Sequence, residues 1–167
     1  MITLGLAGLF AALVAIPATP TSALAGPPWI SIELPANPYD QSTRGAFLLV
    51  HAFHHGTPVG FPVEGTAEGL VNGERRSVKL EFTPTSRSGV YALKRMWPTE
   101  GTWTLVIKVI QGESDAATAV VELGADGDVI AVRVPTDRRG GWTVPAGVSM
   151  DDIDGALRAR AAALAGR

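Results

Sequence analysis

Short apolar runs separated by turn residues recur along the chain from Trp29 to about residue 134. Within 102–110, apolar side chains occupy every second position, which is the period of a strand with one buried face. Runs spaced by about eight to twelve positions are typical of a β-sandwich or barrel. The segments that we expect to form strands are 29–34, 45–53, 63–71, 77–82, 90–97, 102–110, 117–123 and 128–134. The pattern therefore predicts an all-β domain of about eight antiparallel strands over residues 26–135.

Two dipeptides mark tight hairpins between these strands. Asn72-Gly73 and Asp126-Gly127 both combine residues that tolerate positive φ, as the favoured two-residue hairpin turns require. We also expect 90–97 to pair with 102–110 across the turn at 98–101. These hairpins would join sequence neighbours into antiparallel pairs.

The tail does not follow the strand pattern. Residues 135–148 contain two prolines and three glycines, so we expect an extended linker over 136–148. Ser149 then stands in the N-cap position of a predicted amphipathic helix, which we place at about 150–165 within the segment 149–167. The apolar stripe of this helix consists of Met150, Ile153, Leu157 and Leu164. Such a helix is too short to be stable alone, so it must pack on its own domain or on a partner.

The first 25 residues form a separate segment without a charged side chain. Residues 2–16 make an apolar run of the length expected for the core of a signal peptide, short of the roughly 20 residues that a spanning helix needs. Ala23 and Ala25 supply the small residues that a signal peptidase reads. We therefore predict a signal peptide over 1–25, cleaved before Gly26, and a periplasmic or extracellular protein that is at most peripheral to the membrane. A retained anchor is the alternative.

Composition and charge narrow the possible functions. The chain is 46% hydrophobic and 18% charged, with a formal net charge of −2 and no cysteine. Nucleic-acid binding requires a basic face, so this balance argues against a nucleic-acid partner. Without cysteine the chain makes no disulfide, thiolate metal site or cysteine nucleophile.

No pattern in the chain indicates catalysis or a cofactor. The serines lack a nucleophile-elbow context. Of the close carboxylate pairs, Glu64 and Glu68 are expected on a solvent face, and Asp151 and Asp152 at a helix N-terminus. The sequence therefore predicts a protein that is not an enzyme and needs no cofactor.

The three histidines raise the possibility of a metal site. His51 and His55 would share one face of a strand, about 13 Å apart, while His54 would point to the other face. His54 and His55 could meet at one ion only where the strand ends, with Met96 as a thioether donor for copper. Ordinary histidines at a strand end are the simpler interpretation.

The most interaction-like stretch lies in the tail. Arg138, Arg139 and Trp142 combine exposed charge with an aromatic residue on an irregular segment, a composition favoured at protein interfaces. The apolar helix residues Ile153, Leu157 and Leu164 follow. We predict that these six residues contact a protein partner, with an open alternative in which the tail folds back and covers the edge strand of the sandwich.

A loose resemblance covers about half of the chain. The segment 89–109 has glycine-x-tyrosine on one strand and a proline-glycine turn, then tryptophan with alternating aliphatics; the matching residues are Gly89, Tyr91, Gly101 and Trp103. This outline resembles small exported bacterial immunoglobulin-like domains of the YtkA/FixH kind, over residues 29–110. The resemblance implies an immunoglobulin-like sandwich with an accessory or binding role, in a grouping partly connected with metal handling. The chain has no clear copper motif and no clear membrane anchor.

Two functional hypotheses follow. The first is a non-enzymatic exported β-sandwich that docks as an accessory subunit on a larger, membrane-associated complex through its linker and C-terminal helix. The second is a periplasmic domain that binds or delivers copper or zinc at the strand end between His51 and His55.

Overall fold

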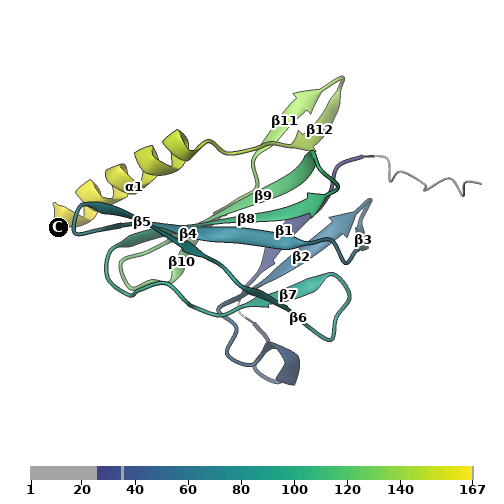
Figure 1. The fold of residues 1–167 in the computed structure, drawn as a ribbon, viewed down its shortest axis with the longest axis horizontal. Coiled ribbons are helices and arrows are strands. Elements are labelled where there is room, and N and C mark those ends of the chain that lie inside the picture. Colours follow the sequence, from purple (N-terminus) through teal and green to yellow (C-terminus); the bar gives the residue numbers. More distant parts are fainter. Residues whose placement is uncertain (1–25, 35, 167) are drawn as a thin grey trace, which may run out of the picture.

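A computed structural model describes residues 26–34 and 36–166, and the predicted signal peptide lies outside these residues. Two five-stranded antiparallel sheets pack face to face, followed by a small hairpin and one helix (Figure 1). The antiparallel sandwich and the C-terminal helix are confirmed. Twelve strands occur in the described part of the chain, against about eight expected from the sequence.

The first sheet has the order β1-β2-β7-β6, with the short β3 paired to β2. Its strands are β1 (Trp29–Glu33), β2 (Leu48–His54), β3 (Thr57–Pro58), β6 (Phe82–Pro84) and β7 (Val90–Leu93), and a 3-10 turn (Gln41–Thr43) lies between β1 and β2. The second sheet has the order β10-β9-β8-β4-β5. Its strands are β4 (Val63–Val71), β5 (Glu74–Lys79), β8 (Thr102–Gln111), β9 (Asp115–Leu123) and β10 (Val129–Arg133).

The core lies between the two sheets and follows the predicted alternation. Leu48 and Val50 of β2 meet Leu105 and Ile107 of β8 in one cluster, and all four side chains are fully buried. Burial of an aliphatic side chain of this size contributes about 1.5–3 kcal/mol. The alternating residues of each strand face away from the core, so each sheet also has an outer face.

Two of the expected hairpins form, and one does not. Val71 pairs with Glu74 across Asn72-Gly73, and β9 pairs with β10 around Gly127. The expected pairing of 90–97 with 102–110 is wrong, because β7 pairs with β2 and β6 whereas β8 pairs with β4 and β9. The connection between β7 and β8 crosses from one sheet to the other.

The segment 136–148 is not an extended linker, which corrects the prediction from its glycines and prolines. It contains a hairpin of β11 (Thr136–Arg139) and β12 (Trp142–Pro145), with four paired positions. Its turn, Gly140-Gly141, has φ values of 56° and 86°, which glycine adopts without steric cost. The hairpin projects from the sandwich near one end of β9 (Figure 1).

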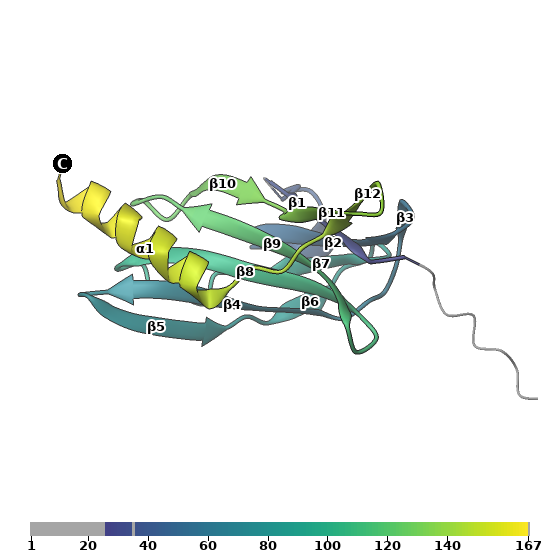
Figure 2. The same ribbon diagram turned by 90° about the horizontal axis from the view of Figure 1, so that it is seen from above.

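The helix α1 (Met150–Ala165) lies where the sequence predicted it. The Ser149 side chain caps it by accepting a hydrogen bond from the Asp152 backbone N–H at 3.1 Å. The helix runs across the outer face of the second sheet (Figure 2), where Ile153 and Leu157 pack on Val106 and Val120. Within the described residues, no helix has the length and apolar character needed to cross a bilayer.

Polar contacts fix the helix to the sheet. The Arg75 guanidinium donates to Asp154 Oδ1 of the helix at 2.6 Å and to Glu68 Oε2 of β4 at 2.7 Å. Burial by itself lowers the pKa of Arg75, but the hydrogen bonds to Asp154 and Glu68 outweigh burial and raise that pKa. Glu68, which we expected on a solvent face, is therefore a buried carboxylate beneath the helix, where Ser77 also donates to it at 2.9 Å.

Candidate functional site

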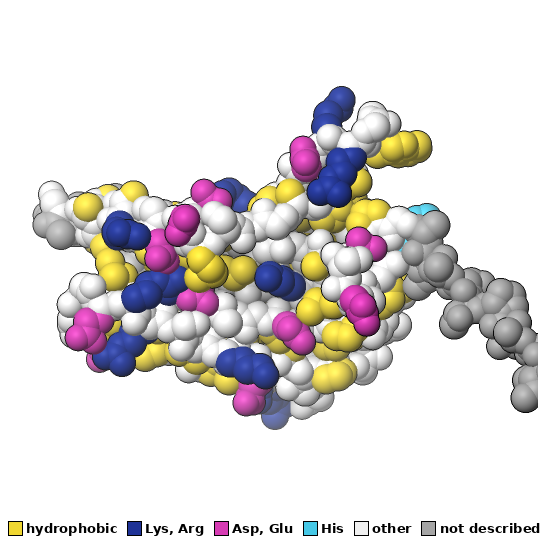
Figure 3. Space-filling view, turned by 45° about the horizontal axis from the view of Figure 1, so that its top comes forward, with side chains coloured by type: hydrophobic (Ala, Val, Ile, Leu, Met, Phe, Trp, Pro, Cys, Tyr) yellow, Lys and Arg dark blue, Asp and Glu magenta, His cyan; other side chains and the backbone are white. Residues whose placement is uncertain are grey.

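The β11–β12 hairpin carries the most exposed aromatic residue of the tail. Trp142 is 76% exposed and pairs across the turn with Arg139, so an indole and a guanidinium lie on neighbouring strands. Arg138 is exposed on the same strand as Arg139. Figure 3 shows hydrophobic and basic side chains together on this projection. Three of the six predicted partner-binding residues are therefore on one accessible hairpin.

A cleft of about 670 Å³ lies between this hairpin and the second sheet. Its walls come from the β8–β9 end of the sheet, from β11 and β12, from the segment that leads to the helix, and from the first described residues. The residues lining it are Gly26, Pro27, Lys108, Ser114, Asp115, Ala116, Thr118, Asp137, Arg139, Val144, Pro145, Ala146, Gly147 and Val148. The hairpin therefore supplies one wall of a concave surface as well as a projecting tip.

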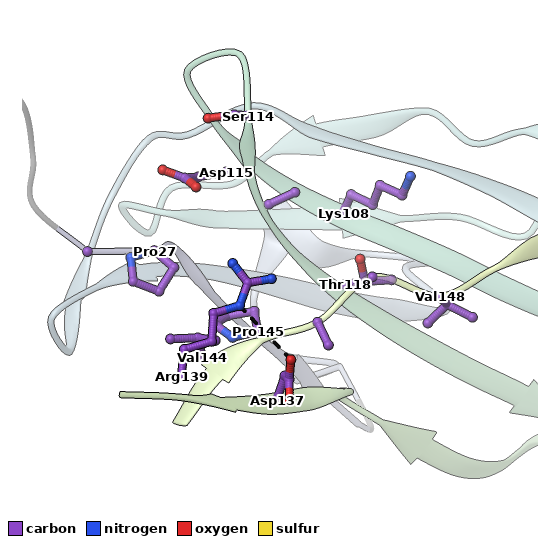
Figure 4. A pocket seen from close by; sticks show the side chains of 14 residues that line it. Pro27, Lys108, Ser114, Asp115, Thr118, Asp137, Arg139, Val144, Pro145 and Val148 are labelled. Atoms are coloured by element: carbon purple, nitrogen blue, oxygen red, sulfur yellow. Dashed lines mark ion pairs between the residues drawn. The ribbon is translucent and has the colours of Figure 1, made fainter. Parts of the chain in front are cut away.

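The polar groups of the cleft come from both sides. Arg139 extends into the cleft from β11, and Lys108, Asp115 and Thr118 lie on the facing strands (Figure 4). Asp137 forms a long ion pair with Arg139, 4.0 Å between Oδ2 and Nε, and its Oδ1 accepts a hydrogen bond from the Arg138 backbone N–H at 2.7 Å. Among the described residues Lys108 has no ion pair. Lys108 can therefore pair with an anionic group of a bound molecule, and Arg139 can do so in place of its long contact with Asp137.

Ile153 and Leu157 do not belong to this accessible surface. Their side chains are 2% and 1% exposed because the helix packs on Val106 and Val120 of its own sheet. Their predicted role in partner contact is therefore wrong, because folding buries the middle of the apolar stripe. The tail folds back as in the alternative interpretation, but onto the face of β8 and β9 instead of an edge strand.

Leu164 lies at the far end of the helix in a different environment. It is partly exposed and, with Ile130, lines a shallow groove of about 450 Å³ between the helix and the β9–β10 turn. Arg160 borders the same groove and donates to Thr104 Oγ1 at 3.2 Å, and burial lowers the pKa of Arg160. The helix separates this groove from the hairpin, so Leu164 is not part of the hairpin surface.

The structure does not bring Met96 to the histidines. Leu48 of β2 pairs with Leu93 of β7 in an antiparallel ladder, so Met96 lies beyond the Leu48 end of β2. His54 stands at the other end of that strand, six residues or about 20 Å away. The combined His54, His55 and Met96 site is therefore wrong. Among the described residues, no group of three histidine, aspartate or glutamate side chains gathers as a metal site would require.

The histidines themselves occupy three different environments. His51 Nε2 contacts Glu33 Oε2 at 2.7 Å on the outer face of the first sheet. His54 turns inward and is 8% exposed, whereas His55 lies in the turn to β3 with φ 50°. The rings of His54 and His55 stack with centroids 4.3 Å apart and an interplanar angle of 9°. The predicted alternation of His51 and His54 between faces agrees with this arrangement.

The hairpin and its cleft were missed at the sequence level, although a signal was present. Gly140-Gly141 is a turn dipeptide of the type that joins two-residue hairpins, and it stands between two runs of four residues, Thr136–Arg139 and Trp142–Pro145. None of these residues is buried, and the runs lack the hydrophobic alternation by which strands are recognised.

No family model, no curated protein and no solved structure matches this chain.

Proposed function

We propose that this protein is an exported, non-enzymatic immunoglobulin-like β-sandwich that binds a protein partner through its β11–β12 hairpin and the adjoining cleft. The observation that carries the proposal is the projecting hairpin with Trp142 76% exposed at its turn. A large aromatic side chain left in water by folding gains most when a partner buries it.

The charge and backbone of the hairpin define the partner further. Among the described strands β11 pairs with β12 alone, so its outer backbone edge is open to an added strand. Arg139 and Lys108 then offer cations to an acidic side chain that enters the cleft. The partner segment that fits is an extended stretch of protein with at least one carboxylate.

The helix has a different role from the one that the sequence suggested. Its apolar stripe covers Val106 and Val120, so it stabilises the sandwich and fixes the segment from which the hairpin emerges. The export signal that the sequence predicts over 1–25 suits a partner at the outer face of a membrane complex.

Site-specific crosslinking in the native host tests this proposal. A photoreactive amino acid is placed at Arg138 or Trp142, and at Tyr39 as the control, because Tyr39 is 90% exposed and belongs to the segment between β1 and β2. We expect one common adduct at the two hairpin positions and none at position 39. The adduct should disappear in Arg139→Glu, which reverses a charge of the cleft. Equal adducts at all three positions, or none at the hairpin, would contradict the proposal.

A further inference from the structure

The first described residue lies against a histidine. A Cβ built on Gly26 would stand 2.8 Å from Nε2 of His55, closer to that atom than to any other of the ring. The imidazole therefore presents its Nε2 end to the backbone of Gly26. Any side chain at position 26 would clash with the ring, so glycine permits this approach.

The same imidazole lies on a second one that lacks a partner. His54 is 8% exposed, and its Nε2 is buried with no hydrogen bond among the described residues. The His54 ring is therefore held by burial and by stacking on His55, with no hydrogen bond at Nε2 among the described residues. The turn accounts for the backbone at His55, since position 55 needs a residue that accepts positive φ. It does not account for an imidazole that presents its Nε2 to Gly26 while it stacks on a second ring.

We propose that removal of residues 1–25 creates a Cu(II) site from the new amino group of Gly26 and Nε2 of His55, with the His54 ring supporting His55. Before cleavage the Gly26 nitrogen is a peptide amide, which is a poor metal ligand. After cleavage it is a primary amine, and an amine with a neutral imidazole is the nitrogen donor set that Cu(II) favours. Processing of the chain would thus create the metal site.

The geometry allows both nitrogens to reach one ion. The Gly26 nitrogen is bonded to the same Cα as the built Cβ, which places it within about 5 Å of His55 Nε2. Two nitrogens that bind one ion lie about 3 Å apart when each metal–nitrogen bond is near 2 Å. The Gly26 nitrogen must therefore move toward His55 Nε2, and a free chain end allows this movement. His54 is not a second chelating ring, because stacked parallel imidazoles direct their nitrogen lone pairs along parallel planes.

The inference rests on the predicted cleavage before Gly26 and uses no residue of the β11–β12 hairpin, although Gly26 also lines the cleft beside it. All described strands and the helix follow Gly26, so a chain that begins there keeps the whole fold. Failure of metal binding would leave the crosslinking result unaffected, and the reverse also holds.

The experiment compares two N-termini and two histidine variants. Cu(II) is titrated by calorimetry, with nitrogen hyperfine structure followed by electron paramagnetic resonance, into the chain that begins at Gly26 and into the same chain with Ser-Ala added before it. We expect stoichiometric binding to the first and affinity about 100-fold weaker for the extended chain. His55→Asn keeps a residue that tolerates positive φ, and its affinity for Cu(II) should fall by the same factor. His51→Ala, with its ring held by Glu33, should bind like the parent.

Three outcomes would overturn the proposal. Equal affinity in the extended chain would show that the amino group is not a ligand. Unchanged binding in His55→Asn would assign the copper to the chain end alone, and absence of stoichiometric binding to the chain that begins at Gly26 would exclude the site.

Discussion

The helix α1 and the β11–β12 hairpin are neighbours in the sequence, and both lie outside the two main sheets, yet folding treats them in opposite ways. The helix buries Ile153 and Leu157 almost completely against its own domain. The hairpin leaves Trp142 in water and keeps an open strand edge. The helix is therefore a segment that stabilises the fold, whereas Trp142 of the hairpin contributes little to it and stays available to a partner.

This contrast corrects the simplest interpretation of an amphipathic tail. An apolar stripe on a short helix indicates only that the stripe must be covered, and here the domain itself covers it. An exposed tryptophan has no such internal partner and therefore points outward. Substitutions in the helix should change stability, and substitutions in the hairpin should change binding.

The largest effect is expected for Leu157→Ala. This side chain is fully buried between the helix and Val106 and Val120, so truncation leaves a cavity and lowers the free energy of unfolding by about 3 kcal/mol. Urea unfolding followed by circular dichroism measures the change. Leu164→Ala, on the exposed end of the same helix, is the matched control and should change stability by less than about 0.5 kcal/mol. Equal effects of the two substitutions would show that the helix is not docked as described.

Loss of the polar anchor should be the next largest effect. Arg75→Ala leaves the Glu68 carboxylate buried without its cation and releases Asp154, at a cost of about 2 kcal/mol in unfolding free energy. Arg76→Ala removes a neighbouring arginine whose partner, Glu74, is largely exposed, and should be nearly neutral. If Glu68→Gln combined with Arg75→Ala does not recover part of the lost stability, the buried charge is not the cause.

The sequence predicted the main elements because burial imposes a readable pattern on them. β4 begins and ends where the alternation of Val63–Val71 indicated, and the helix matches its Ser149 cap and apolar stripe. Pairing between sheets was harder to predict. The strands at 90–93 and 102–111 are both mostly buried, and nothing in their alternation states which sheet each one joins.

The candidate site was predicted only in part, for a related reason. Arg138, Arg139 and Trp142 were chosen for their chemistry, and the structure places them together on the hairpin. The cleft was not foreseeable, since Lys108 and Asp115 lie far from Arg139 in sequence and meet it only through the fold. Contact of Gly26 with His55 depends likewise on the path of the folded chain.

A smaller and more local effect is expected at the turn of the hairpin. Gly141→Ala forces a side chain into φ 86° and should destabilise the hairpin by about 1 kcal/mol. Gly147→Ala, where the φ is ordinary and no atom crowds the position, is the control and should leave the hairpin intact. Amide hydrogen exchange should quicken at β11 and β12 and stay constant in α1. Faster exchange in the helix as well would show that the two regions unfold as one unit.

The smallest expected effect is a loss of stability at low pH, and it tests whether the helix and the hairpin differ for reasons other than charge. The hydrogen bond from Arg87 is the main cause that lowers the pKa of Glu33 below 4.5; burial opposes it and His51 adds to it. Because the folded state holds this carboxylate ionised more tightly than the unfolded chain does, its contribution is complete above pH 4.5 and is lost as the pH falls through the lowered pKa. Glu33→Gln should therefore flatten the fall in stability below pH 4.5.

Glu33 lies on the first sheet, away from the tail. In urea unfolding, Leu157→Ala and Gly141→Ala should therefore keep the parental dependence of stability on pH below 4.5. If either substitution changes this pH dependence, titrating groups of the tail contribute to the loss of stability in acid. That result would weaken the division between a stabilising helix and a binding hairpin.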